Sequence, residues 1–281
     1  MQRRTILYVI NSETADAEII AAAQTATECE FHLSCLLLNP APALPMYAYG
    51  VSPYGGMNIP DNWSDLVTDA QQRQRERVDV IEGLLAKNET SADVVSVLCS
   101  TVEVKRQIAR AARVCDEVFL DASLRNTPRF LQEAAYGTLF DTPVGLRVNG
   151  SLSTRPARVF VGWDSSQAAA AAVHAALPYL RQASEIMIGC IDPVAIAERD
   201  GQDPGTDLAA WLSRHGCKVT LSQIPSGGNT TSECLKDRAG EFGADLVVMG
   251  AYGHARLLEA VLGGTTRSMI DQTDLPVLLA H

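Results

Sequence analysis

The sequence predicts an α/β protein built from two tandem domains, each a doubly wound, five-stranded parallel sheet. Two observations support this fold class. Short apolar runs alternate with helical patterns along all 281 residues, and the same order of elements occurs twice. Alternation of this kind requires crossover connections, and therefore parallel strands with helices on both faces. A polar segment with Gly and Pro, residues 149–156, separates the halves. We expect domains at 1–150 and 151–281.

The first half contains the following elements in order. Apolar runs predict strands at 5–10, 33–38, 93–99, 118–120 and 144–148. Helical patterns predict helices at 16–28, 61–87, 102–114 and 127–140.

The second half repeats this order. Its expected strands are at 158–162, 186–191, 218–223, 246–249 and 277–280. Its expected helices are at 167–181, 206–215, 231–242 and 257–273. The halves also align residue by residue, with 6–12 over 159–165, 115–124 over 244–253 and 141–144 over 274–277. An internal duplication is the simplest account of this match.

Composition and charge narrow the class of protein. The net charge of −10 argues against nucleic acid or an anionic membrane as the main partner. No apolar run approaches the roughly 20 residues that span a bilayer, and the apolar run at 6–10 is too short for a signal peptide. The seven cysteines form no C-x2-C pair, which is typical of reduced thiols in a cytoplasmic protein.

A glycine motif follows the strand expected at 246–249. It consists of Gly250 and Gly253, then nine residues, then Gly263 and Gly264 with two threonines behind them. Glycines where a strand meets a helix let main-chain amides approach a ligand, and phosphate is the usual occupant. The alternative is that these glycines only end a strand and open a helix.

This motif resembles the nucleotide-binding motif of the universal stress protein family, and the duplication resembles the tandem members of that family. The resemblance implies the strand order 3-2-1-4-5 in each half, an adenine nucleotide α-hydrolase-like fold. It also implies ATP or AMP at the carboxyl ends of strands 1, 2 and 4, with Mg²⁺ as a companion of ATP. It further implies a role in the stress response.

The resemblance assigns the ligand contacts to the second half. The expected binding residues are Gly162, Trp163, Asp164, Ile191, Asp192, Met249, Gly250, Gly253, Gly263, Gly264, Thr265 and Thr266. Asp164 is expected near the ribose and adenine, although it could instead cap the following helix. Ile191 and Asp192 are expected near adenine, and the glycines and threonines near the phosphates. The family commonly has Ser or Thr where this chain has Gly264, so a hydroxyl is missing there.

The first half lacks these features. Asp121 and Leu124 stand where the second half has Gly250 and Gly253, and Asn11 replaces Asp164. A carboxylate directed into a phosphate site would repel the ligand. The sequence therefore predicts one nucleotide site per chain.

Several functional alternatives stay open at this stage. The motif has no lysine and no positioned general base, so we expect no catalytic residues, no metal site and at most slow ATP hydrolysis. The leading interpretation is a nucleotide-binding protein with a sensing or regulatory role. The alternative is a nucleotide-free, dimeric interaction scaffold, with the Pro-, Gly- and Tyr-rich segment 41–60 as a lid, docking arm or idle insertion. An enzyme of the same superfold, such as a nucleotidyltransferase, is disfavoured because its signature motifs are absent.

The last strand of each half also predicts an assembly. The apolar run at 277–280 would otherwise form an exposed sheet edge. In the family such strands pair across a two-fold axis. Here Val144–Val148 could pair with Val277–Ala280 within one chain, which makes an intrachain pseudo-dimer the alternative to a homo-oligomer.

Overall fold

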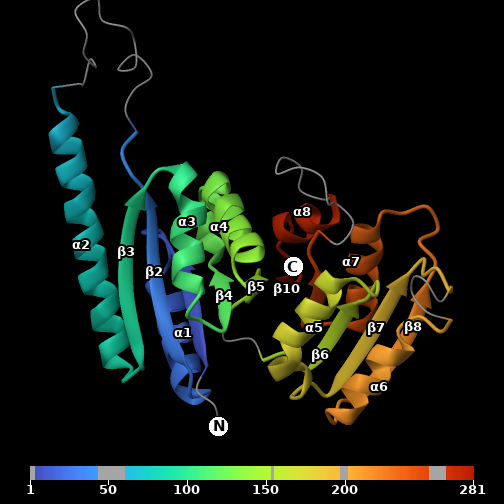
Figure 1. Cartoon of the computed structure of the whole chain (residues 1–281). Coiled ribbons are helices and arrows are strands. Elements are labelled where there is room, and N and C mark those ends of the chain that lie inside the picture. Colours follow the sequence, from blue (N-terminus) through green and yellow to red (C-terminus); the bar gives the residue numbers. More distant parts are fainter. Residues whose placement is uncertain (1–3, 44–60, 153–154, 197–201, 253–263) are drawn as a thin grey trace, which may run out of the picture.

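The computed structural model describes residues 4–43, 61–152, 155–196, 202–252 and 264–281 (Figure 1). Most of the predicted loop 41–60, and the motif glycines Gly253 and Gly263, lie outside these ranges. Within the described part of the chain, no helix is long and apolar enough to span a membrane.

One ten-stranded sheet runs through the molecule, in the order β3-β2-β1-β4-β5-β10-β9-β6-β7-β8. The strands of the first half are β1 (Thr5–Ile10), β2 (His32–Pro40), β3 (Ala92–Cys99), β4 (Glu117–Leu120) and β5 (Gly145–Val148). Those of the second half are β6 (Arg158–Gly162), β7 (Glu185–Ile191), β8 (Val219–Ile224), β9 (Leu246–Gly250) and β10 (Val277–Ala280). Each half has the order 3-2-1-4-5 with parallel neighbours, so the expected fold is confirmed.

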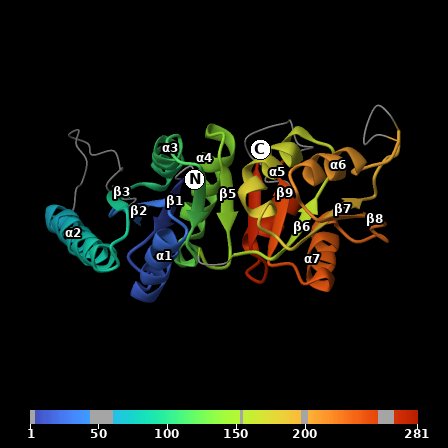
Figure 2. The same ribbon diagram turned by 90° about the horizontal axis from the view of Figure 1, so that it is seen from below.

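Helices cover both faces of this sheet (Figure 2). They are α1 (Asp16–Glu28), α2 (Trp63–Lys87), α3 (Thr101–Ala112), α4 (Pro128–Asp141), α5 (Gln167–Leu180), α6 (Thr206–Arg214), α7 (Thr231–Phe242) and α8 (Gly264–Asp271). Capping boxes begin two of them, Ser100 with Glu103 at α3 and Thr230 with Glu233 at α7. The sequence did not predict the short 3-10 helix η2 (Ala122–Asn126). The first part of the helix expected at 257–273 falls outside the described residues.

The two halves join through their last strands. β5 and β10 pair antiparallel, with Val148 opposite Val277 and Leu146 opposite Leu279. The predicted intrachain pairing is therefore confirmed, and each half covers the edge that the other would expose.

The apolar core is continuous across this joint on one face of the sheet only. There, a single cluster includes Leu146 and Val148 together with Val277 and Leu279, beneath α3, α4, α7 and α8. On the other face, one cluster lies beneath α1 and α2 and a separate one beneath α5 and α6. The halves thus share one apolar core on one face of the sheet and have separate apolar clusters on the other.

Candidate functional site

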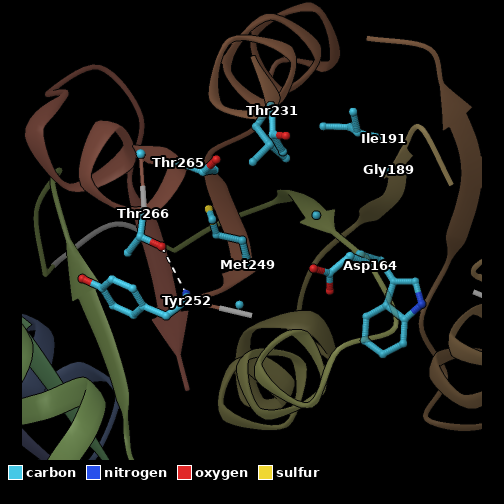
Figure 3. A pocket seen from close by; sticks show the side chains of 13 residues that line it. Asp164, Gly189, Ile191, Thr231, Met249, Tyr252, Thr265 and Thr266 are labelled. Carbon is cyan, nitrogen blue, oxygen red and sulfur yellow. Dashed lines mark hydrogen bonds between the residues drawn. The ribbon is translucent and has the colours of Figure 1, made fainter. Parts of the chain in front are cut away.

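A cavity of about 340 Å³ lies at the carboxyl ends of β6, β7 and β9, beside the first turn of α8 (Figure 3). The strand order reverses here, and ligands of open α/β sheets bind at such points. Nine of the twelve predicted residues line it: Gly162, Trp163, Asp164, Ile191, Met249, Gly250, Gly264, Thr265 and Thr266. The wall also includes four residues that were not predicted: Gly189, Thr231, Leu235 and Tyr252.

Asp164 follows β6, and its carboxylate points into the cavity (Figure 3). Its Oδ1 accepts a hydrogen bond from the main-chain N of Ser166 at 3.1 Å. The helix cap is Ser166, because its Oγ accepts from the main-chain N of Ala169 at 3.1 Å. The alternative role of Asp164 as the cap of α5 is therefore wrong. A carboxylate in this place can accept further hydrogen bonds from ligand hydroxyl groups.

The first turn of α8 forms another side of the cavity. The first amides of a helix lack intrahelical partners and carry partial positive charge, which suits an anion. The hydroxyl of Thr265 faces the cavity (Figure 3). Thr266 is buried, and its Oγ1 accepts from the main-chain N of Tyr252 at 3.3 Å, which ties the end of β9 to α8. Gly264 is exposed, and an added Cβ would meet no atom within 4 Å.

Apolar side chains also line the cavity. Ile191 ends β7, Met249 stands in β9, and Leu235 comes from α7. Ligand cavities are generally apolar with a few polar groups that set orientation. The arrangement suits a ligand with an apolar ring, hydroxyl groups on one side and an anionic group on another.

Three glycines at the cavity have packing reasons of their own. A Cβ at Gly162 would lie 2.9 Å from Leu235 Cδ2, and one at Gly189 would lie 2.4 Å from Phe160 Cζ. A Cβ at Gly250 would lie 2.5 Å from the main-chain N of Ala169. Gly250 is thus required by the close approach of β9 to α5, and this motif glycine is no evidence for a ligand by itself.

Asp192 does not line the cavity, in contrast to the prediction. Its carboxylate accepts a hydrogen bond from the main-chain N of Ser226 at 2.9 Å, at the end of β8. This hydrogen bonding lowers the pKa of Asp192 from its ordinary value. The left-handed backbone at Asp192, with a φ of 43°, directs the side chain there.

Tyr252 connects the cavity to the first half, a link that the sequence reasoning missed. The centroid of its ring lies 4.7 Å from the ring centroid of Phe140 in α4 and 6.2 Å from that of His281. His281 Nδ1 lies 2.8 Å from the main-chain O of Ala251. Burial raises the pKa of the Tyr252 hydroxyl. Tyr252 stands between Gly250 and Gly253, and this position in the motif was the only hint in the sequence that it lies at the cavity.

At the equivalent positions of the first half, the side chains bind one another. Tyr8 donates a 2.6 Å hydrogen bond to Asp121 Oδ2, and Asp121 Oδ1 accepts from the main-chain N of Ser123 at 2.9 Å and from Thr14. Leu124 is fully buried. Asp121 is buried and caps η2.

The described residues include no candidate metal site. Among those residues, no cluster of three or more His, Cys, Asp or Glu side chains could hold a metal ion.

Part of the second half is similar to a known protein family. Residues 227–281 match the sequence model of the universal stress protein family. These residues of the second half are therefore similar to a universal stress protein domain. The matched residues include α7, β9, α8 and β10, and so three of the elements around the cavity. No curated protein sequence matches the chain.

Solved structures share the whole fold. A universal stress protein from Archaeoglobus fulgidus DSM 4304 has a TM-score of 0.66 at 13% identity, covering 100% of this chain and 99% of that one. A putative universal stress protein from Pseudomonas aeruginosa UCBPP-PA14 has a TM-score of 0.53 at 14% identity, covering 99% and 93%. A protein of unknown function from Pseudomonas aeruginosa PAO1 has a TM-score of 0.52 at 15% identity, covering 99% and 92%. These likenesses concern the fold.

Proposed function

We propose that the second half binds an adenine nucleotide, ATP or AMP, and that the chain acts as a nucleotide-responsive regulator in the stress response. One observation supports this above the others. Asp164 and the first turn of α8 face a single cavity from different sides, and apolar side chains also line it. A nucleotide has the matching order of groups: sugar hydroxyls, an aromatic base and phosphate.

Each part of the cavity has a distinct role in this proposal. The Asp164 carboxylate accepts hydrogen bonds from the ribose hydroxyls. Ile191 and Met249 contact the base. The amides of the first turn of α8 and the Thr265 hydroxyl receive phosphate. Mg²⁺, where ATP is the ligand, is held by the phosphates.

The lining favours binding over catalysis. Asp164 is the one carboxylate among its described residues, and these include no Lys, Arg or His. Phosphoryl transfer requires a group that positions the attacking water and cations that stabilise the leaving phosphate. We therefore propose a sensor that holds its nucleotide. The seven cysteines form no disulfide in the described part of the chain, which supports a cytoplasmic location.

The second candidate is a scaffold that binds no nucleotide. The steric requirement for Gly250 supports it, because packing alone accounts for that glycine. Gly264 also supports the scaffold, because it supplies no hydroxyl group at the first turn of α8, where phosphate would bind.

Isothermal titration of the nucleotide-stripped protein with AMP, ADP and ATP, with and without Mg²⁺, separates the candidates. We expect about one site per chain. Asp164→Asn should weaken binding about tenfold, because the amide nitrogen replaces one acceptor of the ribose hydroxyls. Asp192→Asn is the matched control, since it also changes a carboxylate at a strand end but outside the cavity.

Two results would contradict the proposal. Absence of heat with all three nucleotides would favour the scaffold. Equal weakening by both variants would show that Asp164 acts through general charge rather than through contact with the ribose.

A further inference from the structure

A second cavity, of about 380 Å³, lies between the two halves. Its lining comes from the end of α1, the start of β1, strand β5, the linker and the end of α5. It occupies the face of the sheet on which the apolar clusters of the two halves are separate. The volume falls within the range of small-molecule sites.

A buried ionic cluster forms one wall of this cavity. Glu117 is buried, and its carboxylate lies 3.0 Å from Arg147 Nε and 2.9 Å from an Arg4 guanidinium nitrogen. Tyr179, from α5 of the second half, donates a 2.7 Å hydrogen bond to Glu117 Oε2. Burial and the Glu117 charge raise the pKa of Tyr179 to about 12, so its hydroxyl stays protonated.

The cluster contains more positive than negative charge. Two guanidinium groups, Arg4 and Arg147, share the single carboxylate of Glu117. The Arg147 side chain is only 4% exposed, whereas that of Arg4 is 25% exposed and lines the cavity. A buried excess charge is costly unless a counterion compensates it.

Other charged side chains at the cavity do not neutralise this excess positive charge. At the rim, Arg155 pairs with Glu28 at 3.0 Å, which is neutral as a pair, and both side chains are exposed. Glu30 also lines the cavity but is exposed, so solvent screens it. The excess charge therefore lies at Arg4, inside the cavity.

Most of the remaining wall is apolar. Phe31, Leu152, Pro156 and Pro178 line it. Such a wall suits the hydrocarbon part of a ligand, while Arg4 suits an anionic end.

We propose that this cavity binds a small organic carboxylate with an apolar body, its carboxylate paired with Arg4. The ligand carboxylate restores one negative charge for each guanidinium in the cluster. Its apolar part fills the space between α1 and α5. Because the ligand contacts both halves, its binding stabilises the arrangement of the two halves.

Calorimetric titration with octanoate tests this proposal, with 1-octanol and octylammonium as matched neutral and cationic probes. We expect octanoate to bind at least about tenfold more tightly than octanol, and octylammonium not to bind. Octanoate should also slow alkylation of Cys29, which lines the cavity and is half-buried.

Variants locate the site. Arg4→Met leaves Arg147 and Glu117 as a neutral pair and should weaken octanoate binding about tenfold, whereas Arg4→Lys should retain most of it. Arg158→Met is the matched control. Arg158 also pairs with a glutamate, Glu185 at 3.2 Å, and lies over an aromatic ring, that of Phe242, but outside this cavity. Circular dichroism of each variant checks that the fold is retained.

The proposal is overturned if octanoate and octanol bind equally, if Arg4→Met binds octanoate as the unmodified protein does, or if octanoate gives no heat and leaves Cys29 alkylation unchanged. None of these measurements depends on nucleotide binding, so the result stands apart from the proposed function.

Discussion

Arg125 of the first half donates a 2.7 Å hydrogen bond to the main-chain oxygen of Ile270 in the last turn of α8. It also donates to the main-chain oxygens of Asp271 and Gln272, at 3.0 and 2.9 Å. The last carbonyls of a helix lack intrahelical partners, and a cation there complements the helix dipole. A residue of the first half thus holds the helix whose other end lines the proposed nucleotide site.

Arg125→Ala should lower the free energy of unfolding by about 2 kcal/mol, since several charge-assisted hydrogen bonds are lost. Urea denaturation measures the loss. The control is Arg267→Ala, which removes an exposed pair with Asp271 on the same helix and should cost less than about 0.5 kcal/mol. Equal losses in both variants would show that Arg125 contributes no more than a surface charge.

Gly250→Ala should destabilise the protein by about 2 kcal/mol or more, because the new Cβ would lie 2.5 Å from the backbone of α5. Gly264→Ala should stay within about 0.5 kcal/mol, since open space surrounds that position. Thermal and urea denaturation of the two variants test this contrast. Similar stability of both would mean that β9 and α5 move apart without cost.

Gly264→Ser should strengthen ATP binding about fivefold, if the proposed site is correct. The new hydroxyl adds one hydrogen-bond donor at the anion side, with a contribution of about 1 kcal/mol. Calorimetry with ATP measures it, and Gly264→Ala serves as the control that adds a methyl group without a donor. A gain in both variants would assign the effect to the helix rather than to the hydroxyl.

Glu117→Gln should lower the free energy of unfolding by about 3 kcal/mol, because Arg147 and Arg4 would lose their shared counterion in a buried place. Glu185→Gln, which breaks the exposed pair with Arg158, should cost less than about 0.5 kcal/mol. Octanoate should partly restore the stability of the Glu117→Gln variant in a denaturation experiment. Full stability without it would show that the cluster tolerates two unpaired guanidinium groups.

The sequence was sufficient for the architecture because the relevant signals are local. Apolar runs and capping residues mark strands and helices, and the alignment of 6–12 with 159–165 reveals the duplication. The antiparallel joint followed from the apolar last strand, which needs a neighbour. The place of Asp164 beside the glycine motif was implied by the resemblance to the universal stress protein family.

The remaining features depend on side-chain orientation, which spacing does not determine. Asp192 follows its strand as Asp164 does, yet it turns to Ser226 because its backbone is left-handed. Asp121 stands at the position equivalent to Gly250, and its carboxylate accepts hydrogen bonds from Tyr8 and Ser123 of its own half. The contact between Tyr252 and Phe140 joins residues far apart in the sequence, and no local sequence pattern predicts it.

The antiparallel seam between β5 and β10 has a consequence for the protein in the cell. Two separate copies that meet at such a seam dissociate on dilution, and they present identical binding sites. Here both partners belong to one polypeptide, so the seam forms with a high effective concentration that does not depend on how much protein is made. Because the two halves belong to one polypeptide, their sequences do not have to be identical. One side can therefore diverge while the other keeps its cavity, and the pairing of β5 with β10 is the same at low and at high abundance.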